Sequence, residues 1–155
     1  MIPSGPELRE ALAEAGADAW LIFEFHGLNP VARRLLPLSG LNTRRLFVLL
    51  PAEGEPVAIA HRIELHPLAG FPGRVVPYSR WEELHAALGT IVAGRRLAME
   101  ISPEDAVPYL DRVPAGVVEL IRRLADFEGA MLHLRCRSRG DAVCAWHTAA
   151  AEVYE

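Results

Sequence analysis

The sequence predicts an α/β domain in which a mixed β-sheet has helices packed on its faces. Its 155 residues include 51% hydrophobic side chains, which is enough for one domain with a sizeable core. Segments typical of helices and of strands alternate along the chain, and residues 46–50 and 57–60 show a β-hairpin pattern. Between these two apolar runs stand the turn-forming residues Pro51, Glu53, Gly54 and Pro56.

The chain opens with a predicted amphipathic helix and a buried strand. Residues 4–15 favour a helix because Ser4 is a capping residue, Pro6 falls in the first turn and Gly16 ends the pattern. Residues 18–25, DAWLIFEF, form a continuous apolar run that is too short for a helix. Such a run is typical of a strand that is buried on both faces.

Residues 25–43 form a long irregular connection with a predicted helical turn at 33–36. A connection of this length inside a domain is often functional. After the hairpin we expect a strand at 74–78 and then a helix from Ser79 to Gly94, in which Ser79 and Glu82 have capping-box spacing. A strand at 96–101, a short helix at 102–109 and a last helix at 117–124 follow.

From Asp126 the character of the sequence changes. Residues 127–146 have no sustained helical or strand period, and they are followed by a helix-like segment at 147–155. We therefore predict a domain at 1–125 and an atypical tail at 126–155.

The charge and hydrophobic composition of the sequence indicate which classes of partner this chain is not expected to bind. The formal net charge is -4 and all 16 basic residues are arginine, which we attribute to compositional bias. Nucleic acid is not an expected partner, because phosphate binding needs a clustered positive surface. We expect no membrane partner and a cytoplasmic location, since no signal-like segment or apolar run of membrane-spanning length occurs. Cysteine occurs only in the tail, which fits a reducing compartment.

Four segments in this order resemble the N-terminal domain of the prolidase, aminopeptidase P and creatinase family. They cover roughly the first four-fifths of the chain: LREALAEAGADAWLIFEFHGLNP, LSGLNTRRLFVLLPAEGEPVAIAH, FPGRVVPYSRWEELHAAL and RRLAMEISPEDAVPYLDRVPAGVVELI. The resemblance implies a three-layer α/β/α domain with a mixed sheet. It also implies a homodimer, because subunits of this family pair partly through this domain.

The same resemblance implies that the catalytic residues of the family lie in a different domain. In this family a C-terminal "pita-bread" domain binds two metals through two Asp, one His and two Glu and hydrolyses the bond before proline. No stretch of this sequence matches those ligand motifs, so we expect no peptidase activity and no cofactor from this polypeptide alone. The poor match at 127–146 between better matches suggests a local frame slip in a truncated gene.

Four residues beside the predicted strands are candidates for substrate gating, namely His26, Asn29, Arg44 and Arg45. In dimers of the family, loops of the N-terminal domain approach the partner's active site, so the resemblance implies this role. The alternative is that they are solvated loop residues, with Asn29 extended because it precedes Pro30. Trp20, Phe23 and Phe47 are predicted core residues.

A second candidate site lies in the tail. The tail contains the ligand types of a tetrahedral zinc site in His133, Cys136, Cys144 and His147, although the loop between the two ligand pairs is short. A disulfide between Cys136 and Cys144 is the competing interpretation.

Three functional hypotheses follow. The first is a catalytically inert N-terminal domain that retains dimerisation and substrate gating. The second is an independent interaction module with no peptidase role, whose partner is its own or an intact paralogue. The third is a small metal-binding protein. Motifs for a serine hydrolase elbow or a phosphate-binding loop are absent from the sequence.

Overall fold

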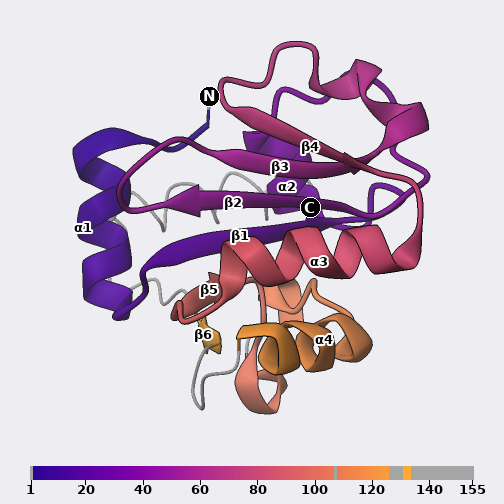
Figure 1. The fold of residues 1–155 in the computed structure, drawn as a ribbon. Coiled ribbons are helices and arrows are strands. Elements are labelled where there is room, and N and C mark those ends of the chain that lie inside the picture. Colours follow the sequence, from indigo (N-terminus) through magenta and orange to yellow (C-terminus); the bar gives the residue numbers. More distant parts are fainter. Residues whose placement is uncertain (1, 107, 126–130, 134–155) are drawn as a thin grey trace.

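The computed structural model describes residues 2–106, 108–125 and 131–133, and it contains a six-stranded mixed sheet (Figure 1). The strand order is β4-β3-β2-β1-β5-β6. The strands are β1 (Ala19–Glu24), β2 (Leu46–Pro51), β3 (Val57–His61), β4 (Arg74–Tyr78), β5 (Leu97–Met99) and β6 (Met131–His133). The α-helices are α1 (Gly5–Ala15), α2 (Pro30–Leu35), α3 (Trp81–Val92) and α4 (Ala115–Ala125).

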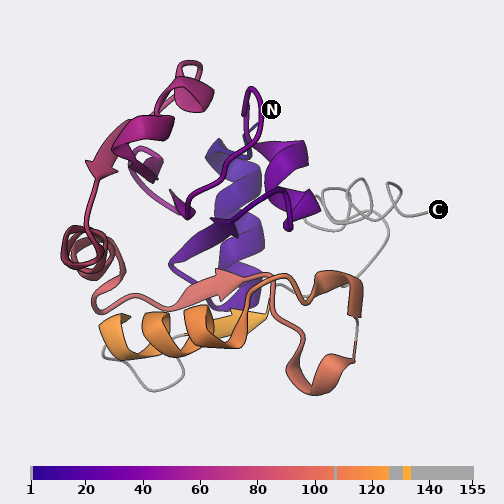
Figure 2. The ribbon, with the colours of Figure 1, turned by 90° about the vertical axis from the view of Figure 1, so that its right-hand side faces the viewer.

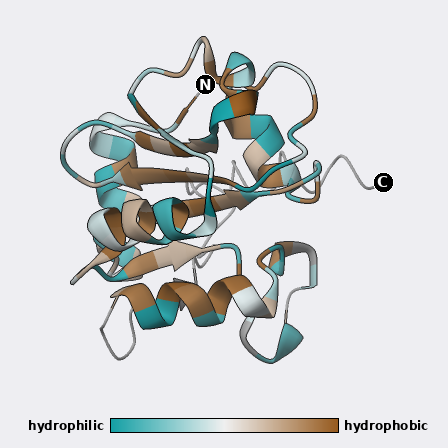
Figure 3. Cartoon of the chain, turned by 45° about the vertical axis from the view of Figure 1, so that its right-hand side comes forward, coloured by the Kyte–Doolittle hydropathy of each residue, from teal (hydrophilic) through white to brown (hydrophobic). Residues whose placement is uncertain are grey.

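The helices cover both faces of the sheet, which gives the predicted three-layer α/β/α architecture. Trp20 and Ile22 of β1 share a hydrophobic cluster with α1 and α2. Leu21 and Phe23 point to the other face and share a cluster with α3 and α4. Figure 3 shows the hydrophobic colours along the strands and on the helix sides that meet them. All six residues of β1 are buried, which explains its unbroken apolar run.

The strand directions bring many chain segments to one edge. β1 pairs antiparallel with β2 and parallel with β5, while β3 pairs antiparallel with β2 and parallel with β4. The carboxyl ends of β1, β3, β4 and β5 therefore meet where β2 begins. We call this side the carboxyl edge. It lies on the right in Figure 1 and faces the viewer in Figure 2.

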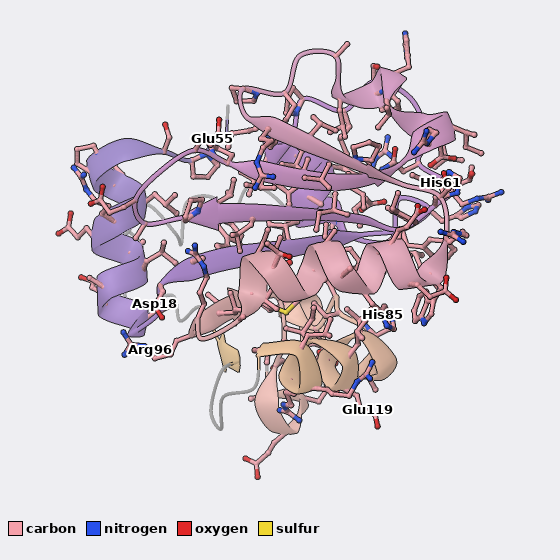
Figure 4. The ribbon with its side chains drawn as sticks, viewed as in Figure 1. Asp18, Glu55, His61, His85, Arg96 and Glu119 are labelled. Atoms are coloured by element: carbon pink, nitrogen blue, oxygen red, sulfur yellow. The ribbon has the colours of Figure 1, made fainter. Side chains whose placement is uncertain are left out.

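The opposite edge is held by Asp18 and Arg96. Their side chains form an ion pair of 3.1 Å, and the Arg96 backbone N–H donates to Asp18 Oδ2 at 2.7 Å. The Ala52 N–H donates to the Asp18 carbonyl at 3.0 Å. These contacts join the start of β1 to β5 and to the end of β2, and Figure 4 shows Asp18 and Arg96 together at this edge.

Several helix ends match the sequence analysis and others differ. Gly16 and Gly94 follow α1 and α3 with positive φ angles of 70° and 68°, a conformation that glycine adopts without strain. Ser4 precedes α1 but makes no side-chain capping bond. The capping box predicted from Ser79 to Glu82 is wrong by one residue. Glu83 instead accepts hydrogen bonds from the Ser79 and Arg80 amides, so α3 starts at Trp81.

Three other elements depart from the prediction. The helical turn expected at 33–36 belongs to α2, which starts earlier, at Pro30. The helix expected at 102–109 is replaced by the 3₁₀ turns Pro103–Asp105 and Pro108–Leu110. Within the predicted tail, Met131–His133 forms β6 parallel to β5. A strand of three residues is too short to show a period in the sequence.

None of the helices in the described part of the chain has the length and apolar character needed to span a bilayer.

Gly73 provides a test of the packing between β3 and β4. A Cβ atom at this position would lie 2.2 Å from the carbonyl oxygen of Pro56, which already accepts the Arg74 N–H. We predict that Gly73→Ala lowers the free energy of unfolding by about 1–3 kcal/mol, because backbone atoms must move apart. Chemical denaturation measures this change.

Gly70→Ala is the matched control, because a Cβ at Gly70, in the same connection, meets no atom within 4 Å. Its free energy of unfolding should stay close to that of the wild type. Equal destabilisation by the two substitutions would contradict this account of the β3–β4 contact.

Candidate functional site at the carboxyl edge

The carboxyl edge carries the large hydrophobic side chains that the described part of the chain exposes. Leu28 is 60% exposed, Leu41 55%, Ile63 69% and Trp81 47%. They come from the loop after β1, the loop before β2, the segment after β3 and the start of α3. Exposed apolar side chains that gather on one side of a protein mark interaction surfaces more often than scattered ones do.

Beneath this surface lies a cluster of buried polar side chains, which we call the buried carboxylate cluster: Trp20, Glu24, Asn29 and Glu100. Each of the four is at most 2% exposed. Asn29 Nδ2 donates to Glu100 Oε2 at 3.0 Å and to the Phe23 carbonyl at 2.8 Å, and Trp20 Nε1–H donates to Glu100 Oε1. The cluster therefore joins β1 to the residue that follows β5.

Glu24 shapes the loop that leaves β1. Its carboxylate accepts hydrogen bonds from the Gly27 N–H and from the Asn29 N–H, the second at 3.1 Å. The side-chain oxygen of Asn29 accepts the Ala32 N–H at 3.2 Å and so caps α2. The turn requires positive φ angles at His26 and Gly27, 57° and 75°.

Burial shifts the ionisation of both carboxyl groups in the cluster. Desolvation raises the pKa of Glu100 from its ordinary 4.5 to about 7, although the hydrogen bonds from Trp20 and Asn29 act in the opposite direction. Desolvation also raises the pKa of Glu24, against the hydrogen bonds from Gly27 and Asn29 and the charge of Arg33. Carboxyl groups with raised pKa values concentrate at functional sites.

A pocket of about 380 Å³ opens at the carboxyl edge, between the starts of α3 and α4. Its lining is mostly apolar and contains one charged side chain: Phe23, Phe25, Arg45, Phe47, Trp81, Pro114, Gly116, Val117 and Leu120. The Arg45 guanidinium carbon lies 4.6 Å from the centre of the Trp81 ring, a cation–π contact. Tyr78 fixes the backbone there, because its hydroxyl donates to the Arg45 carbonyl at 2.8 Å.

A second pocket, of about 370 Å³, lies over Asn29. It shares Phe23, Phe25 and Pro114 with the first pocket and adds Leu28 and Asp111 to the lining. Both pockets therefore border the segment that leads into α4.

Two further contacts shape the carboxyl edge. The Glu64 carboxylate accepts the Arg44 N–H at 2.9 Å and the Thr43 N–H at 3.0 Å, which holds the loop before β2. The His85 ring packs against Trp81 with centroids 4.1 Å apart and the ring planes tilted by 58°, and its Nε2 is buried without a hydrogen-bond partner. Burial lowers the pKa of His85, and the charge of Arg123 lowers it further. Figure 4 shows His61 and His85 on this side.

The structure places all four predicted gating residues at the carboxyl edge, in two different settings. His26, Arg44 and Arg45 are exposed. Asn29 is extended, with φ −105° and ψ 98°, and it is buried with its side chain held in the cluster. Trp20, Phe23 and Phe47 are core residues, as predicted.

Sequence reasoning missed Glu24, Glu100 and Trp81 as parts of the site. The available signal was the position of each acid at the end of an apolar strand-like run, where a carboxylate must find a partner.

The zinc candidate of the tail cannot be placed. Cys136, Cys144 and His147 lie outside the described residues, and of His133 only the backbone is described. Among the residues that are described, no group of three or more His, Cys, Asp or Glu side chains is arranged to hold a metal ion. The boundary predicted at residue 125 also stays a prediction.

Fold and site together define a three-layer α/β/α domain with one apolar, arginine-bearing edge. No protein-family model and no curated protein matches the sequence. Solved structures do match the fold. The creatinase/prolidase N-terminal domain of an X-Pro dipeptidase from Streptococcus pyogenes has a TM-score of 0.61 at 13% identity, with 83% of this chain and 99% of that chain covered.

Two further structures agree. The N-terminal domain of cytoplasmic peptidase PepQ from Mycobacterium tuberculosis has a TM-score of 0.53 at 16% identity, covering 93% of this chain and 95% of its own. The prolidase from Pyrococcus horikoshii has a TM-score of 0.57 at 16% identity. The match covers 82% of this chain but 31% of that prolidase. The chain therefore has the fold of creatinase/prolidase N-terminal domains and spans about a third of the longer enzyme.

The raised pKa of Glu100 predicts how stability depends on pH. The folded state holds the proton up to a pH of about 7, whereas the unfolded state loses it near 4.5. The stability contributed by the protonated carboxyl is therefore complete below pH 4.5 and is lost as the pH rises through 7. Relative to Glu100→Gln, the wild-type free energy of unfolding should fall by roughly 3 kcal/mol over that range.

Urea denaturation of both proteins from pH 4 to pH 8.5 measures this difference. Glu119→Gln, a change at an exposed acid of α4, is the control and should follow the wild type. A constant difference between wild type and Glu100→Gln across the range would contradict the raised pKa.

Proposed function

We propose that this chain serves as the non-catalytic N-terminal domain of a metallopeptidase that resembles Xaa-Pro dipeptidase and aminopeptidase P. In this proposal the carboxyl edge pairs with a second subunit and limits which peptides reach a catalytic site. The partner is a second copy of the chain or an intact paralogue, and the location is the cytoplasm. The likeness to isolated creatinase/prolidase N-terminal domains, which this chain covers almost completely, supports the role.

One observation carries the proposal. Leu28, Leu41, Ile63 and Trp81 are all exposed on the carboxyl edge. An apolar surface of this kind is stabilised when a partner covers it. Arg44 and Arg45 stand exposed beside it and supply charge for recognition. A bound peptide would meet these two arginines together with His26 of the neighbouring loop. Asn29 lies buried below and positions that loop.

An independent interaction module with no peptidase role is the second candidate. The same exposed edge favours it, because the edge would serve any partner with a complementary apolar face. The two candidates differ in the partner that they require, and that difference can be measured.

Sedimentation of the purified chain over a range of concentrations tests the first candidate. We expect a reversible dimer, and we expect the double substitution Leu41→Ser with Trp81→Ser to weaken it at least tenfold, because both side chains lose apolar contact area. Glu10→Ser, on the exposed side of α1, is the control and should leave the dimer unchanged.

Two results would decide against a dimer through this edge. One is a monomer at every concentration, together with no binding to an intact paralogue. The other is a dimer that the double substitution leaves intact. Binding to an unrelated protein through the same edge would favour the independent module.

A further inference from the structure

The carboxylate of Glu100 is bonded only to donors. Trp20 contributes an indole N–H and Asn29 an amide N–H, one to each carboxylate oxygen. Such an arrangement satisfies the ionised carboxylate, which can only accept hydrogen bonds. It does not satisfy the protonated acid, whose O–H needs an acceptor.

The same carboxylate is fully buried, and the shift of its pKa has no ion-pair cause. Burial favours the neutral form and the two hydrogen bonds favour the charged form, so the two effects on the pKa oppose each other. These opposing effects bring the pKa to about 7, which means that small changes in pH change the protonation state.

We infer that Glu100 is a proton-operated latch on the loop between β1 and α2. When Glu100 is ionised, it holds the Asn29 amide, and Asn29 holds both the Phe23 carbonyl and the first turn of α2. When a proton from solvent binds a carboxylate oxygen, the carboxyl group loses its charge and holds the Asn29 amide more weakly, because hydrogen bonds to an ionised acceptor are the stronger ones. The same Asn29 side chain also donates to the Phe23 carbonyl and accepts the Ala32 N–H.

A weaker bond to Glu100 loosens the hold on the Asn29 side chain. A shift of that side chain disturbs both its bond to the Phe23 carbonyl and its cap on the Ala32 N–H. The Asn29 backbone also donates to Glu24, so a change at Asn29 reaches the Gly27 turn through that carboxylate. Protonation of Glu100 is thereby coupled to the position of residues 25–29.

The elements that neighbour Glu100 carry other charged groups. On the β1 and α2 side these are Glu24, His26 and Arg33, and the charges of the last two lower the pKa of Glu24. On the segment after β5 they are Asp111, which accepts the Ser102 N–H, and Arg112, whose backbone N–H donates to the Glu100 carbonyl. None of their charges contributes to the raised pKa of Glu100, so burial at Glu100 itself sets the response.

The latch has a consequence for partner binding, and that consequence rests on the proposed function. Leu28 and His26 lie on the loop that the latch controls, so partner affinity would change over the pH range in which Glu100 titrates. The latch itself can be observed in the isolated chain without any partner.

Nuclear magnetic resonance of the ¹⁵N- and ¹³C-labelled chain between pH 4.5 and pH 8.5 tests the latch. The Trp20 indole signal, assigned by its loss in Trp20→Phe, should shift with a midpoint near pH 7. The amides of Gly27 and Asn29 and the Glu100 carboxyl carbon should follow the same midpoint. In Glu100→Gln the shared transition at Trp20, Gly27 and Asn29 should vanish, whereas Glu119→Gln should retain it.

Two results would overturn the inference. The first is a Glu100 carboxyl carbon that titrates near its ordinary pKa of 4.5, which the wild type alone reveals even if Glu100→Gln fails to fold. The second is a Glu100 midpoint near pH 7 with no accompanying change at Gly27 and Asn29. A dimer whose affinity is independent of pH, beside an intact shared transition, would count against the gating proposal and leave the latch standing.

Discussion

The complete burial of β1 is the constraint on which the rest of the structure depends. The strand has neighbours on both sides and helices on both faces, so every residue from Ala19 to Glu24 is buried. Five of these residues are apolar, but the last is a carboxylate. A buried carboxylate requires hydrogen-bond donors. The chain meets that need by turning back at once, so that the amides of Gly27 and Asn29 reach Glu24.

This turn organises the carboxyl edge. It delivers Asn29 to the position where it can cap α2 and reach Glu100 at the end of β5, and it leaves Leu28 on the outside. The edge thus has two layers that differ in polarity and in exposure to solvent. The buried layer is polar and sensitive to protonation, whereas the exposed layer is apolar with arginines beside it. The proposed partner contact belongs to the outer layer, and the latch belongs to the inner one.

The sequence predicts most of the fold because hydrophobic runs and turn residues report local structure. The burial of residues 19–24, the hairpin and the glycine ends of α1 and α3 are all of this kind. The buried carboxylate cluster could not be found in this way, since Asn29 and Glu100 are 71 positions apart and meet only because β1 pairs with β5. Likewise, the contact of Arg45 with Trp81 depends on how α3 approaches the start of β2.

Hydrogen–deuterium exchange of the intact chain at low and high protein concentration tests the central claim, that the carboxyl edge is the surface a partner covers. The account predicts slower exchange on association at the loop after β1, the loop before β2 and the start of α3, with α1 unchanged. Protection confined to α1 and the opposite edge, where Asp18 meets Arg96, would contradict it.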